Sequence, residues 1–371
     1  MDNKLYIGQN NTNPIYYLPD KNINGHILIT GKSGSGKTSA IKNILNQLSQ
    51  TDALLYALDF SKSLELKPTD FSNLDILLDF SITKPFSTHY NGNNASQTLL
   101  QKADIISSVW KLGSTQRTCI IKALLAMQSI FLKNSMILNS NNSFLPYMKA
   151  STNLPEPDFA LLSYLLEEIN TTTSINLSEK FIDIILHVYS DNVLSQKILP
   201  LDHRRHIIYN YPSSNCEINK KLTELFLWNI WIIRSNNYDI SMPPIYIILD
   251  ECQQLSFNDN TIMKKLLTEG RKFGFNLILS TQSLFYGFDK AAQSSLMQCG
   301  LRLIFNPPEA ELSLTAKSIE QSNWKEWHDI LRNLSVGESI AVGFFSSLRN
   351  NAFQKIRLKT PRAIKEVNHV Q

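Results

Sequence analysis

The sequence has 371 residues, of which 43% are hydrophobic and 18% are charged. This composition is typical of a globular protein and excludes intrinsic disorder. The 36 Lys and Arg residues outnumber the 32 Asp and Glu residues only slightly, so charge alone does not indicate a nucleic-acid-binding protein.

Nothing in the sequence indicates secretion or a membrane anchor. The amino terminus, Met1–Lys4, is polar and lacks the apolar core of a signal peptide. The longest apolar stretches, such as Leu225–Ile233, are too short to span a membrane. The four cysteines form no Cys-x-x-Cys pair and have no metal-ligand spacing, which favours reduced thiols. We therefore expect a cytoplasmic protein without a membrane span.

Short apolar strands alternate with amphipathic helices along the chain, which favours an α/β fold with a mostly parallel central sheet. A hairpin of Leu5–Ile7 with Ile15–Leu18 comes first. Several of the later strands are apolar on both faces, as the central strands of a buried parallel sheet are. These strands are predicted at Ile27–Thr30, Leu54–Leu58, His206–Asn210, Ile245–Leu249, Leu277–Thr281, Leu301–Phe305, Ser339–Gly343 and Lys355–Leu358.

The segment 80–200 differs from the sheet-forming segments on either side of it. Within it, Lys102–Lys111 and Thr115–Lys133 carry apolar residues at helical spacing. We predict that this segment is a helical insertion. Residues 1–79 would then hold the hairpin and the first half of the sheet, and residues 201–371 the second half.

Two features could suggest contact with nucleic acid, but each has a simpler interpretation. A predicted helix at Leu222–Arg234 carries Phe226, Trp228 and Trp231, which are more typical of a core or a subunit contact than of a base-stacking platform. The basic cluster His203–His206 runs directly into a predicted strand, which favours a solvated loop end over a DNA contact.

A glycine-rich octet follows the strand Ile27–Thr30 and precedes a helix-like segment, Ser39–Gln47. Its pattern, Gly-x-x-x-x-Gly-Lys-Ser/Thr, is that of a phosphate-binding loop (P-loop). Glycines permit the backbone angles that turn successive N–H groups toward a phosphate, Lys37 supplies a positive charge, and Thr38 supplies a hydroxyl to Mg²⁺. The sequence therefore predicts ATP and Mg²⁺ here, bound by Gly31, Ser33, Gly34, Ser35, Gly36, Lys37, Thr38 and Ser39.

The predicted strand Ile245–Leu249 ends in two acidic residues, Asp250 and Glu251. An apolar strand of this kind places a carboxylate at the carboxyl edge of the sheet, where the P-loop also lies. We expect Asp250 to hold Mg²⁺ together with Thr38, and Glu251 to orient and deprotonate the attacking water. For Glu251, a surface carboxylate is the alternative.

Two further residues complete the predicted catalytic set. Gln282 ends the strand Leu277–Thr281, where its amide could sense the γ-phosphate or simply cap the strand. Arg271 lies near the end of the predicted helix Ile262–Phe273, where it could reach the γ-phosphate of a neighbouring subunit as an arginine finger, or form a surface ion pair. The predicted catalytic residues are Glu251, Gln282, Arg271 and Lys37.

The order of these motifs resembles that of the FtsK–HerA superfamily of P-loop ATPases, which are ring-forming DNA motors. The resemblance is closest to HerA-like helicase/translocase domains and to conjugative coupling proteins. It rests on Gly31–Thr38, Leu249–Glu251, Glu269–Gly274 and Ser280–Gln282, in this order, and Val336–Ile340 near the end of the chain also fits.

This resemblance implies a RecA-like fold, a homo-oligomer in the form of a hexameric ring with ATP between subunits, and translocation along double-stranded DNA. It also implies the sensor role for Gln282 and the finger role for Arg271. HerA-like proteins usually carry an amino-terminal β-barrel, whereas here only the segment before Gly31 precedes the loop. We therefore expect the ring to need the helical insertion or another subunit for its assembly.

The function that we expect is that of an ATP-hydrolysing translocase or helicase acting on double-stranded DNA. By analogy alone, it would work with a nuclease or other effector partner in restriction or phage defence. Two alternatives stay open: a mobile-element motor for conjugation or packaging, and a regulatory ATP-binding switch that assembles a complex without pumping DNA. A small-molecule kinase fits less well, because Glu251 and Gln282 are suited to activating water.

Overall fold

The computed structural model describes residues 4–17, 24–59, 64, 75–77, 95–134, 206–209, 216–236, 238–347 and 350–360. The chain divides into two compact units, each described here by itself. Unit 1 comprises residues 1–78, 200–210 and 237–371, and unit 2 comprises residues 79–199 and 211–236. The basic residues His203–Arg205 and the part of the predicted insertion after Asn134 lie outside the described residues. The predicted domain boundaries stay a prediction.

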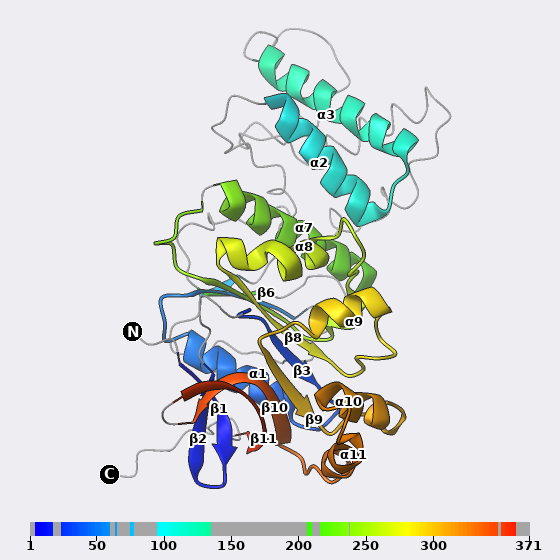
Figure 1. The fold of residues 1–371 in the computed structure, drawn as a ribbon. Coiled ribbons are helices and arrows are strands. Elements are labelled where there is room, and N and C mark those ends of the chain that lie inside the picture. Colours follow the sequence, from blue (N-terminus) through cyan, green and yellow to red (C-terminus); the bar gives the residue numbers. More distant parts are fainter. Residues whose placement is uncertain are drawn as a thin grey trace. The chain divides into compact units, whose positions relative to one another are not determined.

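Unit 1 is built on one eleven-stranded sheet with the order β11-β1-β2-β10-β9-β3-β8-β7-β4-β6-β5 (Figure 1). The seven strands from β9 to β5 in this order run parallel to one another, which confirms the predicted α/β fold with a largely parallel sheet. The strands are β1 (Leu5–Asn10), β2 (Asn13–Tyr17), β3 (Ile27–Thr30), β4 (Leu54–Leu58), β5 (Asp75–Leu77), β6 (His206–Tyr209), β7 (Ile245–Leu249), β8 (Phe275–Thr281), β9 (Leu301–Phe305), β10 (Glu338–Ser347) and β11 (Asn350–Lys359).

Helices cover both faces of this sheet. Leu303 on β9 packs into the core cluster that contains the apolar side of α1, whereas the next residue, Ile304, packs against α10 and α11. The alternation follows from the two-residue period of a strand. The helices of unit 1 are α1 (Lys37–Leu48), α8 (Ile262–Glu269), α9 (Lys290–Leu296), α10 (Leu312–Ile319) and α11 (Trp324–Arg332), with 3-10 turns η5 (Cys252–Gln254), η6 (Gly270–Phe273) and η7 (Glu309–Glu311).

The predicted amino-terminal hairpin joins a hairpin from the other end of the chain. Strand β1 pairs with β2, β2 with β10, β10 with β11, and β11 with β1, so these antiparallel strands close on themselves. Gly343 permits the close approach of β10 to β9, because a Cβ atom there would lie 2.2 Å from the carbonyl oxygen of Gly300. This closed set of strands extends the parallel part of the sheet beyond β9.

Unit 2 contains the helices α2 (Ala95–Trp110), α3 (Ser114–Asn134) and α7 (Cys216–Asn236). Helix α2 contacts both α3 and α7. The ammonium of Lys221 on α7 lies 5.4 Å from the centroid of the Trp110 ring and donates a hydrogen bond to the carbonyl of Val109. Phe226 and Trp231 are buried, as expected for core residues. Among the helices of the described ranges, none combines the length and the hydropathy that crossing a bilayer requires.

Candidate functional site

The carboxyl ends of three neighbouring parallel strands bring the predicted site residues to one edge of the sheet. Strand β3 leads into the P-loop, β8 leads into Gln282, and β7 leads into Asp250 and Glu251. In the sheet β8 lies between β3 and β7. Gln282 therefore projects from the strand that separates the P-loop from the acid pair, an arrangement that the sequence order of the motifs does not reveal.

The P-loop has the backbone shape that its glycines permit. Gly31, Gly34 and Gly36 have φ angles of 149°, 73° and 115°. A Cβ atom on Gly31 would lie 2.6 Å from the Cβ atom of Phe305 on β9, so a larger residue does not fit there. The loop thus turns tightly between β3 and α1, whose amino-terminal end offers unpaired N–H groups to an anion.

Lys37 begins α1 and is buried, with 7% of its surface exposed. Its ammonium donates hydrogen bonds to the carbonyl oxygens of Gly31 at 2.7 Å and Lys32 at 3.1 Å. Burial lowers the pKa of Lys37 from its usual value, and the carboxylates of Glu251 and Asp250 partly oppose this shift. The two acidic residues are thus close enough to favour a charged ammonium at the loop.

Two segments distant in sequence hold the P-loop in place. The carbonyl of Asn306, directly after β9, accepts a hydrogen bond from the Lys32 N–H group at 2.8 Å. The Gly337 N–H group, directly before β10, donates to the carbonyl of Ser35 at 2.9 Å. In the sequence, Val336–Ile340 is notable only through the family resemblance, which assigns it no role. The structure places its glycine against the loop.

The acid pair and Gln282 form a connected set of hydrogen bonds. Asp250 is buried, and one of its carboxylate oxygens accepts from the backbone N–H of Glu251 at 3.0 Å. Glu251 has a left-handed backbone with a φ of 53°, a conformation that is uncommon for residues other than glycine. Its side chain accepts hydrogen bonds from the amides of Gln282, at 2.6 Å, and Gln253, at 2.5 Å. Glu251 is therefore held in one orientation beside Gln282.

Arg271 lies apart from this set. It belongs to the turn η6, which precedes β8, so it lies at the amino edge of the sheet, whereas Gln282 lies at the carboxyl edge. At about 3.3 Å per residue, the seven residues of β8 span roughly 20 Å. The exposed guanidinium of Arg271 thus cannot reach the P-loop of its own chain.

The P-loop and the acid pair fit a magnesium nucleotide. The Ser35 hydroxyl is buried in the loop and has no hydrogen-bond partner among the residues that the structure describes, as expected of a group that can meet a ligand. In the described ranges no group of three or more His, Cys, Asp or Glu side chains could hold a metal by itself. The side chains of Thr38 and Asp250 could hold Mg²⁺ in the usual way, with water and phosphate oxygens as the remaining ligands.

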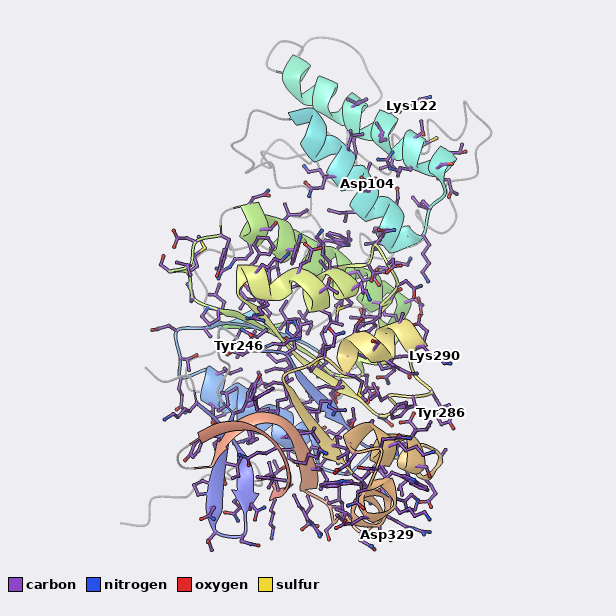
Figure 2. The ribbon with its side chains drawn as sticks, in the orientation of Figure 1. Asp104, Lys122, Tyr246, Tyr286, Lys290 and Asp329 are labelled. Atoms are coloured by element: carbon purple, nitrogen blue, oxygen red, sulfur yellow. The ribbon has the colours of Figure 1, made fainter. Side chains whose placement is uncertain are left out.

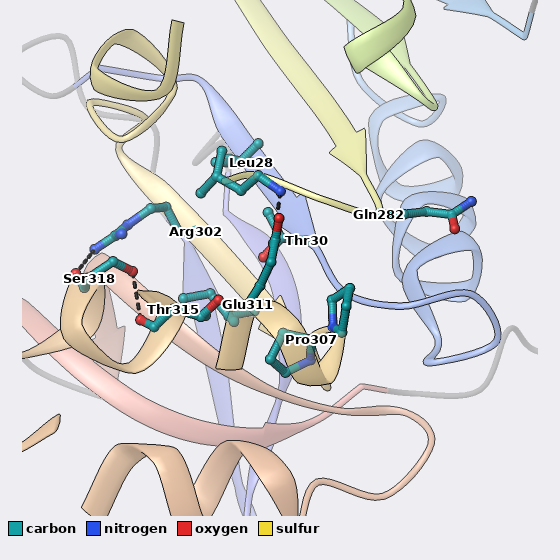
Figure 3. Close-up of a pocket in the computed structure, with 12 residues that line it drawn as sticks. Leu28, Thr30, Gln282, Arg302, Pro307, Glu311, Thr315 and Ser318 are labelled. Carbon is teal, nitrogen blue, oxygen red and sulfur yellow. Dashed lines mark hydrogen bonds between the residues drawn. The ribbon is translucent and has the colours of Figure 1, made fainter. Parts of the chain in front are cut away.

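A pocket lies on the side of the P-loop strand that faces α10 (Figure 3). Thr30, Gly31 and Gln282 contribute to its wall, together with the buried residue Glu311. The sequence gives no signal that Glu311 belongs to the site. It lies in the polar segment Asn306–Glu311, which has neither helical nor strand periodicity.

Comparison with solved structures shows which fold this is. VirB4 of Thermoanaerobacter pseudethanolicus superimposes with a TM-score of 0.63 at 13% identity, covering 96% of each chain. The bacterial conjugative coupling protein TrwBdeltaN70 gives 0.57 at 14% identity, covering 96% of this chain and 88% of that one. The plasmid coupling protein TrwB in complex with ADP and Mg²⁺ gives 0.51 at 15% identity, covering 92% of this chain and 88% of that one.

No protein-family model matches the sequence, and no curated protein sequence matches it. At these levels of identity the likeness concerns the fold. The chain shares the fold of VirB4 and of the coupling protein TrwB, and conjugative coupling proteins are among the proteins that its motifs resemble.

Proposed function

We propose that this protein is an ATP-hydrolysing motor that acts on double-stranded DNA in conjugative transfer. The observation that carries the proposal is the convergence of the P-loop, the acid pair and Gln282 at one edge of the sheet. TrwB, which has the same fold, is a conjugative coupling protein. This comparison favours the mobile-element alternative over restriction or phage defence, and the expected nuclease partner stays a prediction.

The chain's own groups suit hydrolysis. The N–H groups of the P-loop and the Lys37 ammonium would bind the phosphates, with Gly31, Ser33, Gly34, Ser35, Gly36, Thr38 and Ser39 forming the rest of the cradle. Mg²⁺, held by Thr38 and Asp250, would neutralise charge that develops on the phosphate oxygens. Glu251 would take the proton from the attacking water, because its carboxylate is already oriented by two amides. Gln282 would hold that water beside Glu251.

A second copy of the chain would complete the site. Arg271 lies at the amino edge of the sheet, so it would act as an arginine finger on the nucleotide of a neighbouring subunit. This role requires a ring or a similar homo-oligomer, and we propose a hexamer in the cytoplasm. Light scattering with a non-hydrolysable ATP analogue and duplex DNA should show a molar mass several times the 42.3 kDa of one chain. A monomer under these conditions would contradict the role in trans.

The test of the function is the ATPase rate with and without duplex DNA. We expect duplex DNA to stimulate hydrolysis, and we expect the stimulation to fall steeply as salt rises, because DNA phosphate contacts release counterions. A hydrolysis rate that does not change when duplex DNA is added at low salt would instead support the regulatory switch. The protein with Lys37→Ala measures any background from contaminating ATPases.

A further inference from the structure

Glu311 is a buried carboxylate beside the loop that follows Gln282. It ends the 3-10 turn η7, which connects β9 to α10, and 2% of its surface is exposed. A buried carboxylate costs free energy unless hydrogen bonds compensate for its lost hydration. The hydrogen-bond donors to Glu311 therefore show which segment of the chain this carboxylate binds.

The partners are donors from four successive residues of the loop Ser283–Tyr286. The backbone N–H groups of Leu284, Phe285 and Tyr286 donate to the carboxylate at 3.1, 2.9 and 2.9 Å, and the hydroxyl of Ser283 donates to it as well. An ionised carboxylate only accepts, with room for about four hydrogen bonds, so it can satisfy all four donors. Three of the donors bond to one carboxylate oxygen, and the N–H group of Leu284 bonds to the other. An amide of the same shape cannot satisfy all four, because its NH₂ group would take the place of one of these two acceptors.

The same loop fixes the backbone on either side of Gln282. The Thr281 hydroxyl accepts from the N–H group of Ser283 at 3.2 Å and donates to its carbonyl at 3.0 Å. Gln282 sits between these two residues, and its amide reaches Glu251. A shift of the Ser283 backbone would therefore move the amide of Gln282.

The far end of the loop is held separately. The side-chain amide of Gln293 donates to the carbonyls of Phe285 at 2.9 Å and Phe288 at 2.7 Å. The side chain of Tyr286 lies at the surface and is 69% exposed (Figure 2), and its hydroxyl donates to the carbonyl of Ala310 at 3.5 Å. Glu311 is thus the anchor on the Gln282 side of the loop.

We propose that Glu311 is a positioning residue for Gln282. It binds the Ser283–Tyr286 backbone and so keeps the Gln282 amide at the hydrogen-bond distance from Glu251 that hydrolysis requires. In Figure 3 the side chain of Gln282 points away from Glu311, so Glu311 acts on this side chain through the backbone. The inference rests on the proposed function, because it assigns Gln282 a part in ATP hydrolysis.

The test is Glu311→Gln in the full chain. We expect kcat for ATP to fall by about 10- to 100-fold, because small misplacements of a catalytic group cost this much. KM and the affinity for a non-hydrolysable ATP analogue should stay unchanged, since the P-loop is intact. Adding Glu311→Gln to Gln282→Ala should cause no further loss. Parental kcat in Glu311→Gln, or independent losses in the double variant, would overturn the inference.

Two other variants serve as a control and as a second test of the inference. Glu309→Gln is the matched control, since Glu309 lies in the same turn but is exposed and pairs with Arg332 at 3.4 Å; it should keep the parental kcat. Ser283→Ala removes one donor from the loop side and should lower kcat less than Glu311→Gln, again with KM unchanged. If Glu311→Gln does not fold, the kcat of Ser283→Ala becomes the test. A kcat at the parental value in Ser283→Ala would then count against the inference.

Hydrogen exchange tests the role of Glu311 without ATP hydrolysis, so it separates this inference from the proposed function. The amide proton of Leu284 should exchange with solvent faster in Glu311→Gln than in the parental protein, because the oxygen that accepts from it becomes an NH₂ group. Unchanged exchange would overturn the inference. If the parental protein hydrolyses ATP while Glu311→Gln matches it, the inference alone fails; if the parental protein does not hydrolyse ATP, the proposed function fails as well.

Discussion

The two ends of β8 carry different kinds of residue. At its carboxyl end, the side-chain amide of Gln282 donates a hydrogen bond to Glu251, and the P-loop follows the neighbouring strand at the same edge. At its amino end lie the turn with the exposed Arg271 and, buried under the first residues of the strand, His26, whose ring accepts a hydrogen bond from the N–H of Leu277 at 3.0 Å.

This difference separates the steps that one chain can carry out alone from the step that requires a second chain. In the proposed function the carboxyl edge binds the nucleotide and activates water within one chain. The amino edge contributes Arg271 to another chain and, through His26, stability to its own. Changes at the carboxyl edge should therefore alter nucleotide binding or chemistry in cis. Changes at the amino edge should alter chemistry only in trans, or stability alone.

The largest expected effect is that of Lys37→Ala. In the proposed function the ammonium of Lys37 supplies the positive charge at the phosphates, and its removal also leaves the carbonyls of Gly31 and Lys32 without their donor. We expect turnover below detection and strongly weakened binding of a fluorescent ATP analogue. Lys32→Ala is the matched control, because the Lys32 side chain is exposed and only its backbone takes part. Turnover in Lys37→Ala would refute the P-loop assignment.

Arg271→Ala should lower kcat by about 10³-fold or more, the usual effect of losing an arginine finger. Nucleotide binding should be unchanged, because every P-loop stays intact and an arginine finger acts mainly on the charge of the transition state. Steady-state hydrolysis and analogue binding measure the two effects. Lys272→Ala, at the next exposed position, should keep both. Weaker binding in Arg271→Ala would break the proposed separation of the two edges.

Glu251→Gln should lower kcat by about 10²- to 10⁴-fold, the contribution of a general base, while the affinity for ATP stays near the parental value. The neutral amide keeps the shape of the side chain but cannot take a proton. Quench-flow measurement of bound, uncleaved ATP would show the trapped substrate. Hydrolysis at the parental rate would exclude Glu251 as the base.

Mixing Glu251→Gln subunits with Arg271→Ala subunits tests whether the base at the carboxyl edge and the finger at the amino edge can come from different chains. A ring of both contains sites with an intact base and an intact finger from different chains, so partial activity should return. No recovery at any mixing ratio would count against action in trans.

The sequence predicted the parallel strands well because their signal is local. The bounds of β3, β4, β7 and β9 agree with the prediction, since each is an apolar run bounded by turn residues. Helix α7 begins at Cys216, six residues before the predicted start, because its first turns are polar and lack apolar periodicity. Hydrophobic pattern thus located the elements, but not the ends formed by polar residues.

The contacts around the site were less accessible to prediction because they join segments far apart in sequence. Asn306 and Gly337 meet the P-loop only because β9 lies beside β3 and β10 beside β9. Glu311 meets the loop after Gln282 for the same reason, from 25 to 28 positions away. Motif spacing cannot supply a strand order, so the contacts that these residues make at the site appear only in the folded chain.

The smallest expected effect concerns stability and belongs to the amino edge. Burial lowers the pKa of His26 from 6.5 to about 4, and the nearby carbonyls of Leu267 and Leu266 oppose the shift only in part. The unfolded chain therefore takes up a proton between about pH 6.5 and 4 that the folded chain does not. The stability that this neutral histidine provides is complete above about pH 6.5 and is lost as the pH falls toward 4.

From this shift we expect His26 to account for a loss of about 2 kcal/mol in the free energy of unfolding between pH 7.5 and pH 5. Urea titrations of the parental protein and of His26→Gln at both pH values measure it. The variant should lose about 2 kcal/mol less than the parental protein, because glutamine does not titrate. His328→Gln, at a more exposed histidine, should behave like the parental protein. Equal losses in His26→Gln and the parental protein would show that His26 carries none of the acid sensitivity, and the amino edge would then differ from the carboxyl edge through Arg271 alone.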